Sequence, residues 1–167
     1  MISITRPDPV PIREVAAFVN DCWRHTYAGI LDPDFLANLT TDARAGVMGR
    51  QLGSGSEILV AYDGDELVAM SMYGPSHITG WEQAGLLEML YVRPDRIGTG
   101  LGHQLLTRSE ANLDAMGYTT YVLDVVAANT HAIEFYTRHG YARVGDQTLA
   151  VIRGTTHPLD VMVKPAP

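Results

Sequence analysis

Apolar residues recur along the chain at two spacings, one typical of helices and one typical of strands. Asp8 and the proline after it mark the start of the first predicted helix, where apolar residues follow steps of three and four. These residues are Ile12, Val15, Val19 and Cys22. Short runs rich in β-branched and aromatic residues predict strands. The runs cover residues 2–5, 57–62, 66–73, 86–92, 119–126, 141–150 and 159–164.

Further helical segments lie between these runs. A short piece follows a break at Pro33. Longer helices are predicted from about Asp42 to Leu52, over 101–116 and over 130–139. Each is followed by a glycine that can end it, namely Gly53, Gly117 and Gly140. Asn129 or Thr130 can cap the last helix at its N-terminus.

Asp63-Gly64 lies between two strand runs and predicts a tight hairpin. Both central residues of a type I′ turn need positive φ, which Asp-Gly adopts readily. Run 86–92 is almost continuously apolar, as expected for a strand covered on both faces of a sheet. The whole pattern predicts a mixed α/β fold, with a central, mostly antiparallel sheet of six or seven strands and helices on both faces.

Length and composition narrow the class of protein. The 167 residues are 46% hydrophobic, enough for one good core, so we expect a single domain over 1–167. No apolar run approaches the roughly 20 residues of a membrane span, and the first residues lack a signal-peptide pattern. These features predict a soluble, cytoplasmic protein.

Cysteine, histidine and charge exclude further classes. Cys22 is the only cysteine, so an internal disulfide and a multi-cysteine metal site are excluded, and the thiol is predicted to lie in the core. The six histidines lack the HExxH spacing of a zinc site, and no metal is expected. The net charge of −7 argues against nucleic acid as a partner and weakly favours a cationic one.

The strand run before Pro94 ends in a glycine-rich turn that leads into a helical run. Gly98, Gly100 and Gly102 stand there at alternate positions. Such a turn exposes unpaired N–H groups at the positive end of the helix dipole, worth about +0.5 charge, and favours an anion. Without Cβ atoms the backbone can approach a pyrophosphate, to which nearby arginines could add cationic contacts. A tight turn that needs glycine for steric reasons alone explains the same pattern.

Two segments together resemble the GNAT N-acetyltransferase superfamily. Residues 89–106 are similar to its acetyl-CoA motif, a strand ending in V-x-P followed by [Q/R]-x-x-G-x-[G/A] and a helix. Residues 129–141 match its second motif, N-x-x-A-x-x-F-Y-x-x-x-G-[F/Y], at every position. In the first motif Ile97 occupies the place usually held by Gln or Arg, and Arg96 stands one residue earlier.

The resemblance implies acetyl-CoA as co-substrate, held mostly by backbone amides. Asn129 would cap its helix, bind the pantetheine arm, or do both, and the oxyanion donor would be a backbone N–H in the region Leu90 to Val92. The positions so assigned to the cofactor are Leu90, Tyr91, Val92, Arg96, Ile97, Gly98, Thr99, Gly100, Leu101, Gly102, Asn129 and Tyr136.

Transfer to an amine requires a base, because a primary alkylamine with a pKa near about 10.4 arrives protonated. Glu88 is the candidate. Family members that use a glutamate on this strand carry it at the position of Leu86, and alternation in a strand puts 86 and 88 on one face. Alternatively, Glu88 pairs with a neighbouring cation on a partly solvated face.

Tyr136 corresponds to the family position whose phenol protonates the departing CoA thiolate. It follows Phe135 on a helix, so the two side chains diverge by about 100°, and Phe135 can face the core while Tyr136 faces the cleft. Alternatively, Tyr136 is half-buried between helix and sheet with its hydroxyl at the surface.

The acceptor is predicted to be a small amine or a peptide. In the family the N-terminal helices border the acceptor site, and Trp23, Tyr27 and His77 are predicted to line it. The resemblance is also compatible with a homodimer. The leading hypothesis is an acetyl-CoA-dependent N-acetyltransferase that transfers the acetyl group directly.

Two alternatives belong to other classes. A non-catalytic acyl-CoA-binding sensor or interaction module would fit the departures at Ile97 and Leu86. A Rossmann-like nucleotide binder would use Asp124 on the next strand as its ribose acid, but the glycine spacing and the late position of the motif disfavour it.

Overall fold

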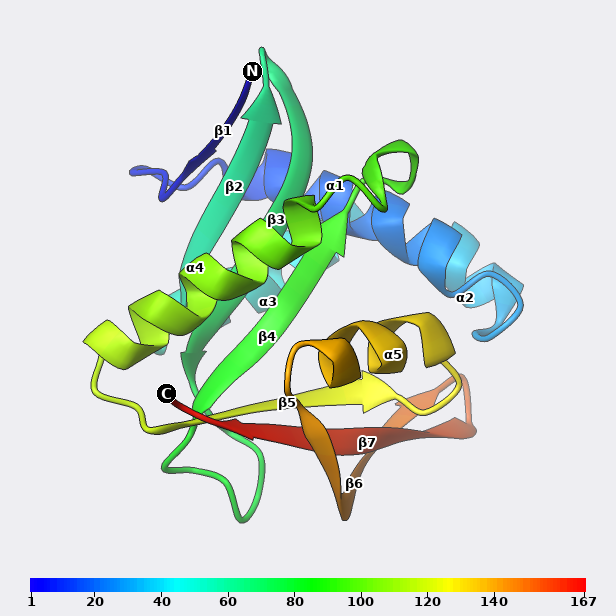
Figure 1. The fold of residues 1–167 in the computed structure, drawn as a ribbon. Coiled ribbons are helices and arrows are strands. Elements are labelled where there is room, and N and C mark those ends of the chain that lie inside the picture. Colours follow the sequence, from blue (N-terminus) through cyan, green and yellow to red (C-terminus); the bar gives the residue numbers. More distant parts are fainter.

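Seven strands form one sheet, which helices cover on both faces. The computed structural model describes residues 1–167 (Figure 1). The strand order is β1-β2-β3-β4-β5-β7-β6, and every neighbouring pair is antiparallel except β4 and β5. The predicted mixed, mostly antiparallel sheet is confirmed, and the number of strands is seven.

The elements lie close to the segments that the sequence predicts. The strands are β1 (Ile2–Thr5), β2 (Glu57–Asp63), β3 (Glu66–Pro75), β4 (Gly85–Val92), β5 (Thr120–Val126), β6 (Ala142–Ile152) and β7 (Thr155–Pro165). The helices are α1 (Ile12–Thr26), α2 (Pro33–Ala37), α3 (Thr41–Gly53), the single 3₁₀ turn η1 (Pro94–Arg96), α4 (Leu101–Ala115) and α5 (Thr130–Arg138).

Each face of the sheet has its own hydrophobic core. Leucines of α4 and Ile133 and Tyr136 of α5 pack on one face against Leu87 of β4 and apolar side chains of β2, β3 and β5. Valines of α1 and Met48 of α3 pack on the other face, against a set that includes Met89 of β4. β4 therefore contributes side chains to both cores, in agreement with its apolar composition.

Three local predictions differ from the structure. Helix α1 begins at Ile12, because the residue before Pro11 is disfavoured in the α region. Helix α3 includes Gly53, and the glycine with positive φ is Gly55. The β2–β3 hairpin forms, but its central residues are 64 and 65 and only Gly64 has positive φ, the pattern of a type II′ turn.

The parallel pair β4–β5 is the shortest contact in the sheet. Its ladder holds only Gly85 opposite Tyr121 and Leu86 opposite Val122. Beyond these pairs the strands diverge, and Figure 1 shows the V-shaped opening between them, with α5 beside it. The edge of β4 that faces β5 is therefore unpaired from residue 87 onward.

A β-bulge lies in β4 at the start of this opening. Opposite β3, Met89 pairs with Met72 and Leu87 pairs with Tyr73, so Glu88 is the extra residue. Across the bulge, Leu87 and Leu90 pack on the α4–α5 core, whereas Met89 packs on the α1–α3 core. The bulge thus directs Glu88 away from α4 and α5, toward α3.

None of the helices combines the length and the apolar composition that crossing a bilayer requires.

Cys22 lies in the core at the contact of α1 with the sheet, as predicted, and is 3% exposed. Burial raises the pKa of its thiol to about 12. We therefore expect no labelling of the native protein by a disulfide reagent at pH 8, and one thiol per chain after denaturation. Rapid labelling of the folded protein would contradict this placement.

Candidate active site

Two cavities meet at the opening between β4 and β5. The loop cavity lies on the α4–α5 side and is lined by the glycine-rich turn and by α5, with Thr26, Leu90, Tyr91, Val92, Arg96, Ile97, Gly98, Gly100, Gly102, His103, Asn129, His131, Ala132, Phe135, Tyr136, Arg138 and His139. Five of these residues also line the second cavity, namely Leu90, Tyr91, Asn129, Ala132 and Tyr136. The two cavities therefore adjoin each other through the opening in the sheet.

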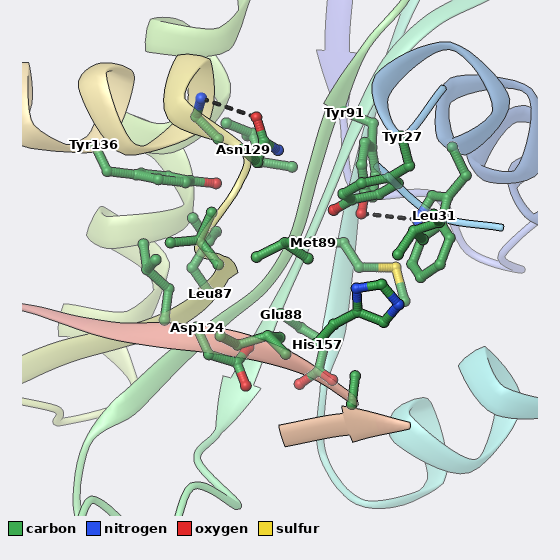
Figure 2. Close-up of a pocket in the computed structure, with 18 of the residues that line it drawn as sticks. Tyr27, Leu31, Leu87, Glu88, Met89, Tyr91, Asp124, Asn129, Tyr136 and His157 are labelled. Carbon is green, nitrogen blue, oxygen red and sulfur yellow. Dashed lines mark hydrogen bonds between the residues drawn. The ribbon is translucent and has the colours of Figure 1, made fainter. Parts of the chain in front are cut away.

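The second, or strand, cavity reaches the opposite face of the sheet (Figure 2). Its other lining residues come from α1, the segment after it, and strands β4 to β7: Trp23, Tyr27, Leu31, Leu87, Glu88, Met89, Leu123, Asp124, Val125, Val126, Ala150, Ile152, His157 and Leu159. In Figure 2, Tyr136 enters this cavity from α5, and Tyr27 and Tyr91 form the wall opposite it.

The glycine-rich turn presents free backbone donors to the loop cavity. Gly98 and Gly100 have φ of 83° and 85°, a left-handed conformation that L side chains rarely adopt. The N–H groups of residues 98 and 100–103 donate to no group of the chain, whereas those of Ile97 and Thr99 make long turn contacts of 3.4 Å. Five of the amides at this helix start are thus available to an anion.

The two arginines near this turn are already paired with carboxylates. Arg96 donates to Asp63 at 2.7 Å, and this ion pair lowers the pKa of the Asp63 carboxyl. Arg93 bonds Asp95 and Glu66 and does not line the cavity. Of the two arginines only Arg96 reaches the cavity wall, and its charge is already paired with Asp63.

Sequence reasoning missed other basic side chains of the loop cavity. Arg138 at the end of α5 has no acidic partner. His139 accepts or donates at 3.0 Å to His103 at the start of α4, and its other ring nitrogen contacts the Phe135 carbonyl. His103 and His139 are 36 positions apart in the sequence, and only the packing of α5 beside α4 brings them together. Nothing in the sequence motif of α5 singles out Arg138 or His139.

The free edge of β4 offers backbone N–H groups to both cavities. The N–H of Arg93 donates to Val68 of β3, and successive amides along a strand point to opposite edges. The N–H groups of Val92 and Leu90 therefore point toward the side from which β5 has diverged. Of the predicted oxyanion region, Leu90 and Tyr91 line both cavities, and of these two it is Leu90 whose N–H points to the free edge.

Tyr136 lies at the junction of the two cavities. It is 9% exposed, and its hydroxyl makes no hydrogen bond within the chain. Burial, with a smaller effect of Tyr27, raises the pKa of the phenol above its ordinary value. The hydroxyl therefore stays protonated throughout the neutral range and can donate a proton. Phe135 packs against α4 beside it but is only half-buried and lines the loop cavity, so the predicted division into a core Phe135 and a cleft Tyr136 is not seen.

Glu88 lines the strand cavity, and its side chain is 12% exposed. Its carboxylate accepts a hydrogen bond from the Gln51 amide of α3 and contacts Nε2 of His77 at 3.2 Å. Leu86, the usual glutamate position, packs instead with Ile78 and Val122. Glu88 is therefore the only carboxylate of β4 that reaches the cavity.

The predicted acceptor residues do not all reach the wall. Trp23 and Tyr27 line the strand cavity, and Trp23 donates to the Tyr91 hydroxyl at 2.9 Å. His77 lies outside the wall with a 67% exposed side chain and touches the site only through Glu88. Asp124, which the sequence suggested only as a ribose acid, lines the cavity, and so does His157.

Asn129 begins α5 where β5 ends. Its side chain accepts from the Ala132 N–H at 3.2 Å, so the predicted N-cap is present. It also lines both cavities. No group of three or more His, Cys, Asp or Glu side chains could hold a metal ion.

Comparison with known proteins agrees with this geometry. The chain is 34% identical over 86 residues to a mycothiol acetyltransferase of Geodermatophilus obscurus. The match covers 50% of this chain and 28% of that protein. The chain therefore spans well under two thirds of that relative's length. Its fold is similar to the PaiA N-acetyltransferase of Thermoplasma acidophilum in complex with coenzyme A, with a TM-score of 0.73, 18% identity and 99% of each chain covered.

A second solved structure is that of YncA from Salmonella typhimurium with its cofactor acetyl-CoA. Its TM-score is 0.72 at 19% identity, and the match covers 100% of this chain and 95% of that one. The family model described as the acetyltransferase (GNAT) family matches residues 15–141. This range includes the glycine-rich turn, β4, β5 and α5, which line the two cavities. The chain belongs to the acetyltransferase (GNAT) family.

Proposed function

We propose that this member of the family transfers an acetyl group directly from acetyl-CoA to a primary amine. The observation that carries the proposal is the junction of two cavities, one with free amides for an anion and one with a carboxylate, with Tyr136 between them. The cytoplasmic location and the homodimer stay predictions from the sequence, and so does the absence of nucleic acid, membrane and metal from the reaction.

The loop cavity fits a CoA diphosphate. Five N–H groups at the N-terminus of α4 have no partner in the chain, and four of the residues that carry them line this cavity, where the helix dipole favours negative charge. Arg138 adds a cation without an acidic partner of its own. These local donors act at contact distance, whereas the net charge of −7 is distributed and screened.

Gly102 supports the same assignment, because the protein's own packing does not require a glycine there. A Cβ at this position would lie 3.5 Å from the Phe135 ring and 3.7 Å from Val92, both ordinary contacts. Its φ is not in the left-handed region. A ligand that approaches the backbone closely would explain a glycine at this position.

The strand cavity supplies the groups that amide formation needs. The ammonium form of the acceptor loses a proton to Glu88, which passes it through the exposed His77 to solvent. The amine nitrogen then bonds to the thioester carbon while the Leu90 N–H donates to the carbonyl oxygen. The carbon–sulfur bond breaks, Tyr136 gives its proton to the leaving sulfur, and a second amine proton restores the phenol by way of Glu88 or water. The products are the acetamide, CoA thiol and one proton in solvent.

The alternative of a non-catalytic CoA-binding module predicts binding without turnover. The Ile97 departure does not remove the backbone donors. The Leu86 departure is matched by a carboxylate two residues later, in the bulge. Both observations favour the enzyme, and release of CoA thiol in the presence of an amine panel separates the two.

Gly102→Ala should weaken acetyl-CoA binding at least about tenfold by isothermal titration, since a methyl group would hold the ligand off the amides. The melting temperature should not fall, because alanine favours a helix. Gly49→Ala in α3, where a Cβ also meets only an ordinary contact at 3.6 Å, is the control and should bind as the parent does. Unchanged affinity in Gly102→Ala would contradict the assignment of the loop cavity to the CoA diphosphate.

Tyr136→Phe should lower kcat about 10²- to 10⁴-fold, because the variant lacks the phenol proton that the leaving sulfur takes up. Since the pKa of the phenol is raised, the parent's rate should show no loss from Tyr136 ionisation below about pH 10. Acetyl-CoA affinity should stay within threefold of the parent. The control is Tyr118→Phe, which lies outside both cavities. A parent-like kcat in Tyr136→Phe at every pH would rule out the proposed acid.

Glu88→Gln should lower kcat about 10²-fold or more at pH 7 and change the pH profile. Without the base, only amine already neutral in solution reacts, so the rate should rise about tenfold per pH unit toward the amine pKa near 10.4. Glu134→Gln removes one exposed carboxylate of α5 and serves as control. If the slope of Glu88→Gln matches that of the parent, Glu88 is not the base.

A further inference from the structure

The strand cavity is acidic although most of its wall is apolar. Its charged lining residues are the carboxylates Glu88 and Asp124, and no lysine or arginine lines it. Arg44 lies nearby, stacked on the Trp23 ring with 4.2 Å from guanidinium carbon to ring centre, but it is not part of the wall. Two like charges facing one space favour a cation between them.

Glu88 and Asp124 occupy equivalent positions on the two diverging strands. The last ladder pair joins Leu86 to Val122, and each carboxylate lies two residues further along its strand. Leu123 and Val125 pack toward α5, so Asp124 points to the opposite face, the face from which Glu88 contacts Gln51. Both carboxylates therefore flank the opening on the same side of the sheet, as Figure 2 shows.

The carboxylates differ in their own partners. Glu88 contacts His77, whose side chain is 67% exposed and gives a path for a proton to solvent. Asp124 accepts from the Thr148 hydroxyl at 2.9 Å and has no titratable partner. Glu88 is thus connected to solvent through a second titratable group, whereas Asp124 has only a hydroxyl donor and leaves its carboxylate for a ligand.

A ring nitrogen of His157 in the same cavity wall has no hydrogen-bond partner. This nitrogen is Nε2, and it is buried. In the neutral tautomer protonated at Nδ1, it offers a lone pair. With Asp124 and Glu88, this nitrogen gives the cavity wall three acceptor groups, which complement an ammonium ion with its three N–H groups.

The remaining wall limits the shape of the acceptor. The cavity holds about 180 Å³, less than the 300–1,000 Å³ usual for drug-sized ligands. Leu31, Ile152 and Leu159 offer apolar surface to a methylene chain, and Trp23 and Tyr27 add aromatic surface to the same wall. A carboxylate on the acceptor would be repelled by both acidic side chains.

We infer that the acceptor is a small aliphatic amine with a second ammonium group, and that Asp124 binds this second ammonium while Glu88 deprotonates the first. The inference rests on the proposed acetyl transfer and names the substrate class of that same site. The second ammonium keeps its protons throughout, so the bonds formed and broken are those of the transfer already described.

The test compares three acceptors that share one amine and the same methylene chain: putrescine, pentylamine and δ-aminovalerate. Their chains end in an ammonium, a methyl and a carboxylate group. In the parent protein, kcat/KM for putrescine should exceed that for pentylamine about thirtyfold, as charged hydrogen bonds give, and δ-aminovalerate should be the poorest. In Asp124→Asn the putrescine-to-pentylamine ratio should fall below about threefold.

The Asp124→Asn substitution is not expected to disturb the fold, because the amide oxygen of the new side chain can still accept from Thr148. Acetyl-CoA affinity, measured by titration, checks this. Asp65→Asn in the exposed β2–β3 turn removes the same charge outside the cavity and should keep the parent's ratio. A preserved ratio in Asp124→Asn, or δ-aminovalerate as the best acceptor, would overturn the inference.

Equilibrium binding separates this inference from the proposed function. Putrescine should bind the CoA-loaded parent and bind Asp124→Asn at least about tenfold more weakly. If putrescine binds in this way but no amine is acetylated, the acetyl transfer is wrong and the diammonium site stands. If pentylamine is acetylated as well as putrescine and putrescine binding does not depend on Asp124, the transfer stands and the diammonium site is wrong.

Discussion

β4 and β5 are joined by only two ladder pairs. Beyond these pairs, the backbone N–H and C=O groups on the facing edges of the two strands need other hydrogen-bond partners. An opening of this kind would be costly if it served no ligand, since unpaired buried N–H groups lose about 1–3 kcal/mol each. Here it connects the loop cavity on one face with the strand cavity on the other. The free amides of β4, the hydroxyl of Tyr136 and both carboxylates all lie along that passage.

The bulge at Glu88 adds the second element of the arrangement. Regular alternation from Leu87 would place residue 89 on the same face, whereas the extra residue returns Leu90 to the α4–α5 side and leaves Met89 on the other. The proposed oxyanion donor and the proposed base therefore come from neighbouring positions of one strand yet serve different sides of the reacting carbon. Substitutions that remove the bulge would move both at once.

Charge is distributed unevenly around the passage. Arg93 and Arg96 are neutralised by carboxylates of the β2–β3 turn and η1, so the anion site depends on main-chain donors and Arg138. The strand cavity has the opposite character, with two carboxylates and an unpartnered imidazole nitrogen. An anionic donor and a cationic acceptor would thus be directed to different ends of one channel, which limits binding in the wrong orientation.

The sequence by itself determined the elements and the donor loop, because local rules govern both. Apolar spacing, turn glycines and an N-cap asparagine act over a few residues, and the glycine-rich turn exposes amides whatever surrounds it. Tertiary structure alone decided the rest: that Arg96 is neutralised by Asp63, that His103 meets His139, that His77 reaches only Glu88, and that Asp124 faces Glu88. These relations depend on strand register and on where a ladder ends, which long-range packing sets and neighbouring residues do not encode.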